Sequence, residues 1–255
     1  MSFPHSTAAA ARLGILASTG STNADLRAHA DDPAGWPHLS AILTEDQVAG
    51  RGRLDRVWTA PAGSAVALSV LLRVPGIPVA ERGWIPLAAG LAMSEAVAAQ
   101  LPERQVGVKW PNDVLVAGRK ISGILAEATG SDTVIVGSGV NTAMTAAQLP
   151  VPTATSFAVE GVEVDIDLLV AGYLARLDAW IARLDEHGSA VASGLRDAVA
   201  ARCLTLGQSV RVVLPGGAEL VGEATGLGED GCLLVTADGA EHRIAAGDIV
   251  HLRPA

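Results

Sequence analysis

Short apolar runs separated by turn-forming residues characterise the first 150 positions of the chain. Residues 41–45 and 64–74 have the composition of strands, and residues 86–101 are rich in helix formers with small side chains. Further short strands are predicted at residues 106–110, 113–116, 121–128 and 133–140. The short connections between them predict antiparallel neighbours, so an α+β domain is favoured over a doubly wound one.

The apolar spacing becomes helical from Asp167 onward. Apolar side chains recur at helical spacing at Leu168, Leu169, Tyr173, Leu174, Leu177, Trp180, Ile181 and Leu184. Gly188 is a typical helix stop. A second helix is predicted over residues 189–201.

Helix formers give way to short β-type segments after Thr205. Strands are predicted at residues 209–214, 219–224, 231–236 and 241–244. Residues 215–217, 229–231 and 238–239 carry hairpin signals, which indicates a small antiparallel barrel. The chain is therefore divided into a larger domain at residues 1–204 and a smaller one at residues 205–255.

Length, charge and cysteine content exclude several classes of protein. The 255 residues are 49% apolar, which suffices for one sizeable core and a small appended domain. A net charge of -9 argues against non-specific nucleic-acid binding. Cys203 and Cys232 are too few for a disulfide framework, and no charged-then-apolar leader begins the chain, so a reducing cytoplasm is expected. The longest apolar run near the front, residues 65–72, is far shorter than the roughly 20 residues of a membrane span.

Scarce polar residues mark a candidate site. The chain has two lysines, Lys109 and Lys120, and both fall within residues 108–125. Its three asparagines are Asn23, Asn112 and Asn141. All five lie in segments punctuated by glycine or proline, or beside Ser21 and Thr22, where loops usually hold binding groups. The alternative is that nucleotide bias in the gene left these residues by chance.

Residues 44–58 form a loop that is suited to an anion. Arg51, Arg53 and Arg56 lie among glycines there, between two predicted strands. Glycines let the backbone approach a ligand, and arginine forks match phosphate or carboxylate. We expect an anion to order this loop. The alternative is a solvated surface loop without a ligand.

Two further segments could contribute to the chemistry. In Lys109-Trp-Pro-Asn-Asp113 the proline breaks the strand and presents Asn112 and Asp113 at a turn, although this is also an ordinary β-turn sequence. Lys120 begins the next predicted strand. Gly123 lies inside that strand, which indicates close approach of a backbone or a ligand.

Taken together, the segments resemble the biotin protein ligases. The resemblance rests on five motifs in the family's order: Ser21-Thr-Asn23, Gly50-Arg-Gly-Arg53 with Arg56 and Trp58, Lys109-Trp-Pro-Asn-Asp113, Gly118-Arg-Lys-Ile-Ser-Gly-Ile-Leu125 and Gly137-Ser-Gly-Val-Asn141. It implies a catalytic domain like that of class II aminoacyl-tRNA synthetases with an SH3-like C-terminal domain. It also implies a two-step reaction: biotin and ATP give biotinyl-5'-AMP and pyrophosphate, and a lysine of a biotin carrier domain then displaces AMP. The resemblance further implies that Mg²⁺ accompanies the nucleotide.

The resemblance assigns roles to individual positions. Lys120 resembles the catalytic lysine, and Arg51 and Arg53 act with it on the adenylate phosphate. The implied biotin contacts are Ser21, Thr22, Asn23, Gln47, Arg51, Gly52, Arg53, Lys120 and Gly123. The implied ATP contacts are Arg56, Trp58, Lys109, Asn112, Asp113 and Asn141, with Asp113 also a magnesium ligand.

The implied partner is a biotin carboxyl carrier protein or the biotin carrier domain of a carboxylase, and dimerisation is left open. Some family members carry an N-terminal helix-turn-helix, but the short segment before Ser21 predicts no DNA-binding role. Asp55 stands where the family commonly has glycine, which leaves the loop's behaviour open. Two alternatives to a biotin ligase are kept: a lipoate-protein ligase and a non-catalytic biotin-binding module.

Overall fold

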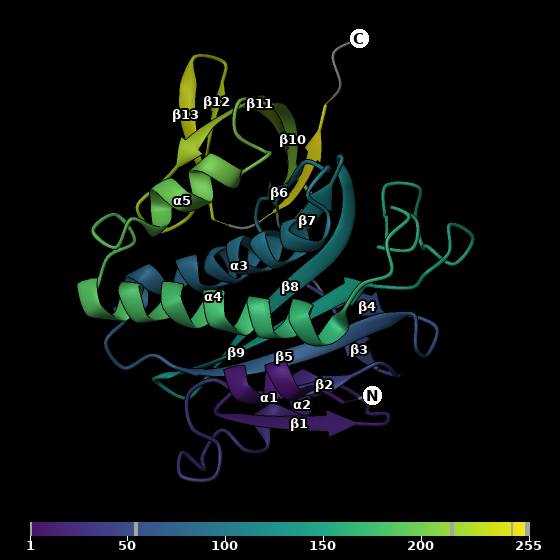
Figure 1. Ribbon diagram of the computed structural model, residues 1–255. Helices are drawn as coiled ribbons and strands as arrows, with labels where there is room; N and C mark the ends of the chain where they lie inside the picture. Colours follow the sequence, from purple (N-terminus) through teal and green to yellow (C-terminus); the bar gives the residue numbers. More distant parts are fainter. Residues whose placement is uncertain (1, 54–55, 215–216, 246, 253–255) are drawn as a thin grey trace.

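The computed structural model describes residues 2–53, 56–214, 217–245 and 247–252. A seven-stranded sheet forms its centre (Figure 1). In spatial order its strands are β1 (Arg12–Leu16), β2 (Ser40–Thr44), β5 (Ala65–Arg73), β9 (Thr133–Asn141), β8 (Arg119–Thr129), β7 (Asp113–Val116) and β6 (Val106–Lys109). Only β1 pairs in parallel within this sheet, as far as the described residues show. The α+β prediction is therefore confirmed.

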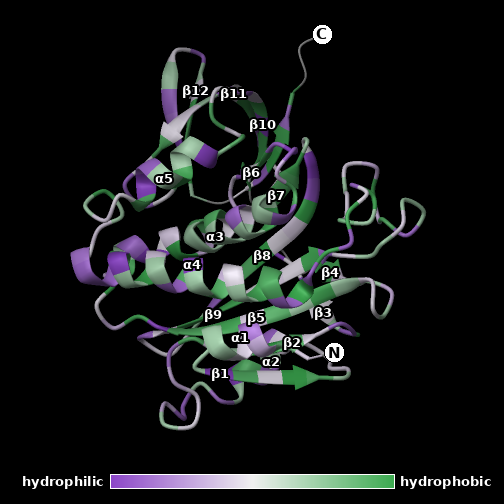
Figure 2. Ribbon diagram, in the orientation of Figure 1, coloured by the Kyte–Doolittle hydropathy of each residue, from purple (hydrophilic) through white to green (hydrophobic). Residues whose placement is uncertain are grey.

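Helices cover the two faces of the sheet unequally. The buried helix α3 (Ile85–Gln100) packs on β6, β7 and β8, and α4 (Ile166–His187) packs on α3 and on α1 (Pro4–Ala9). On the other face, α2 (Thr22–Arg27) packs on β2, β5 and β9. Figure 2 shows β5 and β9 as largely hydrophobic, whereas α4 also carries hydrophilic residues.

Alternate side chains of β5 point to the two opposite faces of the sheet and pack in two different clusters. Val66, Leu68, Val70 and Leu72 belong to the main core, while Leu71 packs in a smaller cluster with Leu26 of α2. Successive side chains of a strand point to opposite faces, so Ala67 and Ser69 lie on the side of α2. The main core therefore leaves the face that carries α2 open for polar groups.

The two long helices follow their local sequence signals. Pro86 occupies the first turn of α3, and small residues such as Gly90 let this helix approach Val108 closely. The Asp165 side chain caps α4 by accepting from the Leu168 backbone N–H, and Gly188 ends the helix with a φ of 61°. Leu168, predicted as part of the apolar stripe, is instead half-exposed.

A five-stranded sheet forms the C-terminal part of the chain. Its order is β13 (Ala240–Ile244), β12 (Leu233–Ala237), β11 (Glu219–Leu227), β10 (Ser209–Val213) and β14 (Asp248–His251). The predicted strands are present, and β14 is an additional strand that returns to pair with β10. Part of the predicted turn at residues 215–217 lies outside the described residues.

Several short elements were not predicted from the sequence. These are α1, β1, α2, a two-stranded ribbon of β3 (Gly50–Arg51) and β4 (Val57–Trp58), and the 3₁₀ turn η1 (Val79–Trp84). The second predicted helix also begins late: α5 spans Leu195–Arg202. Gly194 precedes α5 with a φ of 76°. A residue in this left-handed conformation is not part of a right-handed α-helix, so the helix begins only after Gly194.

Two buried tryptophans of the larger part of the chain bond to the turn between β11 and β12. The Trp84 indole N–H donates to Glu229 O at 2.6 Å, and the Trp110 indole N–H donates to Gly231 O at 2.9 Å. Leu204 N–H also donates to Val108 O at 2.8 Å. These hydrogen bonds connect the two predicted domains closely. The division of the chain between residues 204 and 205 stays a prediction. None of the helices described is long and apolar enough to cross a membrane.

Replacing Trp84 by Phe is expected to lower the free energy of unfolding by about 1–3 kcal/mol, because a fully buried indole is lost together with its hydrogen bond. Urea denaturation followed by circular dichroism measures this. Trp180→Phe is the control, since Trp180 is only partly buried beneath Arg183. A loss for Trp84→Phe no larger than for Trp180→Phe would contradict the role of this contact.

Candidate active site

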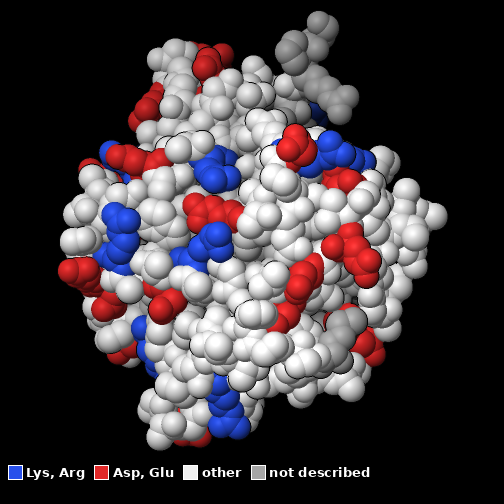
Figure 3. All heavy atoms as spheres, viewed as in Figure 1, with Lys and Arg blue, Asp and Glu red and all other residues white. Residues whose placement is uncertain are grey.

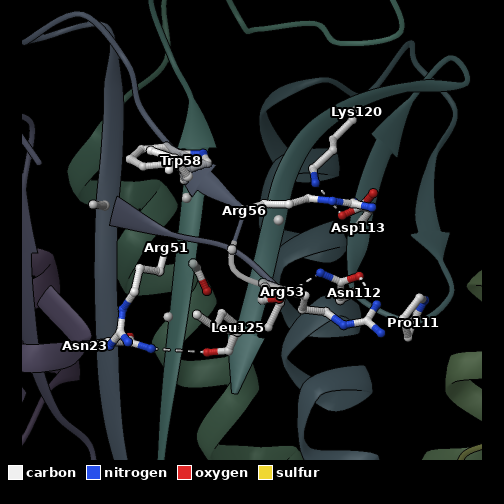
Figure 4. Close-up of a pocket in the computed structure, with 18 of the residues that line it drawn as sticks. Asn23, Arg51, Arg53, Arg56, Trp58, Pro111, Asn112, Asp113, Lys120 and Leu125 are labelled. Carbon is white, nitrogen blue, oxygen red and sulfur yellow. Dashed lines mark hydrogen bonds and ion pairs between the residues drawn. The ribbon is translucent and has the colours of Figure 1, made fainter. Parts of the chain in front are cut away.

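A cavity of about 420 Å³ lies on the face of the sheet that carries α2 (Figure 4). Its walls come from α2, the β3–β4 ribbon, β7, β8, β9 and the C-terminal strand β14. Every residue assigned to a site from the sequence lines this cavity except Asn141; the lining set includes Ser21, Thr22, Asn23, Gln47, Arg51, Gly52, Arg53, Arg56, Trp58, Lys109, Asn112, Asp113, Lys120 and Gly123. Segments as far apart in the sequence as Ser21 and Asp248 are thus brought together around one space.

Lys120 and Asp113 form an ion pair at one end of the cavity. The Lys120 Nζ lies 2.6 Å from Asp113 Oδ1. Lys120 and Gly123 are three positions apart, so a regular strand would place them on opposite faces. A register shift between Val114 and Leu115 in the pairing of β7 with β8 removes this conflict, because the irregularity adds a residue to β8. Both residues therefore reach the cavity.

Arg53 and Arg56 lie between β3 and β4, and each contacts the C-terminal part of the chain. Arg53 Nη1 donates to Asn112 Oδ1 at 3.0 Å, and Arg53 Nη2 donates to Gly247 O at 3.4 Å. Arg56 pairs with Asp248 at the start of β14. The C-terminal sheet thereby contributes directly to the wall of the cavity. Leu54 and Asp55, the latter the departure from the family pattern, lie outside the described residues.

A chain of neutral polar groups lies at the end of the cavity near α2, where Thr22, Asn23 and Gln47 line the cavity and Ser69 lies behind them. Gln47 Oε1 accepts from the Thr22 backbone N–H at 2.9 Å and lies 3.1 Å from the Thr22 hydroxyl. Ser69 Oγ lies 2.7 Å from Thr22 Oγ1 and 2.6 Å from Asn23 Oδ1. Because Oε1 of Gln47 is occupied, its Nε2 remains as a donor.

Asn23 is buried and engaged by protein groups on both sides of its amide. Its Nδ2 donates to Glu127 Oε2 at 2.6 Å and to Leu125 O at 3.5 Å, while Oδ1 faces Ser69. Its predicted direct contact with a ligand stays a prediction. The amide packs against Gly137, where an added Cβ would collide with Asn23 Oδ1.

Lys109 lies beside the ion pair and is partly buried. Burial lowers the pKa of Lys109 below its ordinary value; the charges of Asp113 and Asp248 oppose this, while those of Lys120 and Arg56 add to it. The opposing carboxylates keep an ammonium favourable where burial alone would disfavour it. The site therefore concentrates positive charge in a chain whose net charge is -9.

Asn141 lies at the end of β9 and outside the cavity lining. Its Nδ2 donates to Thr155 O at 2.9 Å, and the Thr155 backbone N–H donates to Lys120 O at 2.7 Å. Asn141 thus connects to the backbone of Lys120 rather than to the cavity. Sequence reasoning also missed Ser69, Glu127 and Asp248. A polar or charged residue within an otherwise apolar strand is the signal that could have found Ser69 and Glu127.

The mixed sheet with its cation-lined cavity and the small antiparallel C-terminal sheet agree with a class II synthetase-like catalytic domain followed by an SH3-like domain, the architecture of a class of ligases that the comparisons with known proteins identify. Residues 16–141 match the Biotin/lipoate A/B protein ligase family, and residues 205–252 match the biotin protein ligase C-terminal domain.

Individual relatives agree with these family matches. The chain is 40% identical to the biotin–[acetyl-CoA-carboxylase] ligase of Mycobacterium tuberculosis, over 95% of this chain and 90% of that protein. It is 34% identical to the enzyme of the same name from Paracoccus denitrificans, over 92% and 98%. The structure of the Aquifex aeolicus biotin protein ligase with biotin and ATP superimposes with a TM-score of 0.78 at 26% identity, covering 96% of this chain and all of that one. The chain belongs to the biotin protein ligase family.

Gly137→Ala is expected to destabilise the protein by about 1–3 kcal/mol, because the new methyl group must displace the buried amide of Asn23. Thermal or urea unfolding measures the loss. Gly226→Ala is the matched control within a strand, since its Cβ would lie 3.5 Å from Leu234, an ordinary contact. Equal effects of the two substitutions would show that Asn23 does not depend on the space at Gly137.

Proposed function

We propose that this protein is an ATP-dependent biotin protein ligase. It activates biotin as biotinyl-5'-AMP and transfers biotin to a lysine of a biotin carrier domain, the carrier being that of an acetyl-CoA carboxylase. The observation that carries the proposal is the arrangement of the cavity. Cationic side chains of Lys120, Arg51 and Arg53 border the same space as the neutral polar groups of Thr22 and Gln47.

The neutral end of the cavity suits the ureido group of biotin. Ureido N–H and C=O groups need partners in a partly buried pocket, where an unpaired polar atom costs about 1–3 kcal/mol. The Nε2 of Gln47 and the hydroxyl of Ser21 offer donors, while the Thr22 hydroxyl, whose proton points to a protein acceptor, can accept. Gly52 and Gly123 leave room for the ligand's body.

The cationic end suits the carboxylate and the phosphate. In the first step, a biotin carboxylate oxygen forms a bond to the α-phosphorus of ATP, and the bond to the bridging oxygen breaks as pyrophosphate leaves. Lys120, held by Asp113 at 2.6 Å, is placed to stabilise the negative charge that develops on the phosphoryl oxygens, with Arg51 and Arg53. In the second step, the amine of the carrier lysine attacks the acyl carbon and AMP leaves.

Arg56, Trp58, Lys109 and Asn112 complete the proposed nucleotide side of the cavity. Asn141 supports this side indirectly through Thr155 and the backbone of Lys120. Asp113 and Asp248 are the acidic side chains of the lining, and Mg²⁺ commonly binds through one or two carboxylates together with substrate phosphates. Asp113 therefore fits a magnesium ion that accompanies ATP and neutralises phosphate charge.

The proposed enzyme is cytoplasmic and has no nucleic-acid partner; the cysteines and the one face drawn in Figure 3 bear on this part of the proposal. Cys203 and Cys232 are buried and free, as expected in a reducing compartment. On the face drawn in Figure 3, acidic and basic side chains of the described residues are interspersed rather than gathered by sign. Phosphate backbones are bound by coherent basic surfaces, which this face does not offer.

Lys120→Ala is expected to slow biotin-dependent pyrophosphate release by roughly a hundredfold to a thousandfold, about 3–4 kcal/mol, by analogy with the loss of one oxyanion donor. Release is measured with purified protein, ATP, Mg²⁺ and either biotin or lipoate, followed by transfer of labelled biotin to a carrier domain. Arg211→Ala, at an exposed position of β10, is the control and keeps wild-type rates.

Three outcomes of this experiment would count against the proposal. Release that depends on lipoate would indicate a lipoate ligase. Biotin binding without release would indicate a binding module. Unchanged release in Lys120→Ala would remove Lys120 from the chemistry.

Asp248→Asn is expected to raise the KM for ATP by no more than about fivefold and to leave kcat nearly unchanged. The ion pair with Arg56 is exposed, Arg56 by 62%, and such pairs contribute about 1 kcal/mol or less. Asp197→Asn, which removes another exposed arginine pair on α5, is the control with no change in KM. A fall in kcat as large as that of Lys120→Ala would mean that Asp248 takes part in the chemistry itself.

A further inference from the structure

Glu127 of β8 contacts two different parts of the cavity wall. One carboxylate oxygen, Oε2, accepts from Asn23 Nδ2 at 2.6 Å. The other, Oε1, lies 2.7 Å from Arg27 Nη2 and 3.7 Å from Arg51 Nη2. The side chain is 22% exposed, so most of it is removed from water. It does not itself line the cavity.

The first contact fixes the direction of the buried hydrogen bonds below the cavity. A carboxylate can only accept, so the Asn23 amide must point its Nδ2 to Glu127 and its Oδ1 to Ser69. The Ser69 proton is then directed to Asn23. The Thr22 hydroxyl, which faces both Ser69 and Gln47, is left as a donor toward one of them. Glu127 thereby sets the polarity of the groups that receive the ureido end of biotin.

The second contact concerns charge. Burial by itself would raise the pKa of Glu127, but the hydrogen bonds from Asn23 and Arg27 and the charges of Arg27 and Arg51 outweigh it, so the pKa lies below its ordinary value. The carboxylate is therefore ionised at neutral pH. The close pair with Arg27 offsets that charge, which leaves the guanidinium of Arg51, 51% exposed, with positive charge to offer an anion.

We propose that Glu127 is a positioning residue for the ligase reaction, which fixes Asn23 beneath the biotin pocket and holds Arg51 at the edge of the cavity. Asn23 and Arg51 are both held by contacts to this one protein side chain, and preorganisation of this kind favours affinity. The inference rests on the proposed function, because it assigns Glu127 to the biotin end of that site.

Glu127→Gln tests the charge while keeping the size of the side chain and an acceptor for Asn23. We expect kcat/KM for biotin in pyrophosphate release to fall by about tenfold to a hundredfold, the size expected when a hydrogen bond to a charged group is weakened. The change should appear in KM. Transfer from preformed biotinyl-AMP to the carrier domain should keep its kcat, because Glu127 does not touch the reacting atoms.

Glu95→Gln is the matched control. Glu95 is 26% exposed and pairs with Arg176 at 3.5 Å, between α3 and α4 and away from the cavity. A purely structural role of Glu127 would lower the melting temperature of both variants and leave KM for biotin unchanged in both. The proposal requires a rise in KM for Glu127→Gln alone.

A double-mutant cycle with Arg51→Gln identifies the route of the effect. If Glu127 acts partly through Arg51, the loss in Glu127→Gln/Arg51→Gln is smaller than the product of the two single losses. Strictly multiplicative losses would overturn the part of the proposal that concerns Arg51. If Glu127→Gln does not fold, Glu127→Asp replaces it; the charge remains, but the shorter side chain withdraws from Asn23, and KM should still rise.

Pyrophosphate release by the wild-type protein distinguishes a failure of the positioning role from a failure of the proposed ligase function. Wild-type protein that shows no biotin-dependent pyrophosphate release refutes the ligase function. Wild-type release together with an unchanged KM in whichever Glu127 variant folds refutes the positioning role alone.

Discussion

The structure depends on glycines in the middle of its main sheet. Gly123 of β8 and Gly139 of β9 face each other across the ladder, and Gly137 is two residues away on the same side. A Cβ would lie 3.0 Å from Lys120 Nζ at Gly123 and 2.7 Å from the Trp58 ring at Gly139, and would collide with Asn23 at Gly137. Glycine weakens a strand by roughly 0.5–1 kcal/mol relative to alanine. The sheet tolerates these glycines because the opposite face of β8 and β9 is packed against the main core. On the face that carries α2, the space left by the missing side chains forms the floor of the cavity.

The sequence predicted the parts of the fold that local patterns determine. The strand at residues 113–116 and the helix ended by Gly188 correspond closely to β7 and α4. The missed elements are short or depend on distant partners. β1 is a five-residue edge strand, α2 has six residues, and β14 is formed by pairing with β10 across an intervening run of strands. Such elements are stabilised by tertiary packing rather than by local propensity, so a single sequence carries little signal for them.

The same limit explains what was predicted of the site. Rare lysines and asparagines pointed to segments that line one cavity, because a composition otherwise dominated by alanine, glycine and arginine made them conspicuous. Glu127, Ser69 and Asp248 were missed because their contacts depend on how distant segments are placed beside one another, which a single sequence does not reveal. Ser69 meets Asn23 only because β5 lies beside α2, and Glu127 meets Asn23 only because β8 places it on the same face as Leu125. Asn141 shows the converse, since its motif was recognised while its side chain turns toward Thr155.

The β3–β4 ribbon forms part of the cavity wall, and the two steps of the reaction make opposing demands on that wall. An acyl adenylate survives if water is kept away from it, whereas the carrier lysine must reach the acyl carbon afterwards. Arg56, which is 62% exposed, pairs with Asp248 at the rim of the cavity. Exposed pairs of this kind contribute about 1 kcal/mol or less each, so thermal motion can break them. A fully buried pair at the same place would be costly to separate, about 3–5 kcal/mol when one partner is left behind, and would hold the cavity shut against the carrier. An exposed pair between Arg56 and Asp248 is therefore compatible with a cavity that must admit the carrier lysine after biotin has been activated.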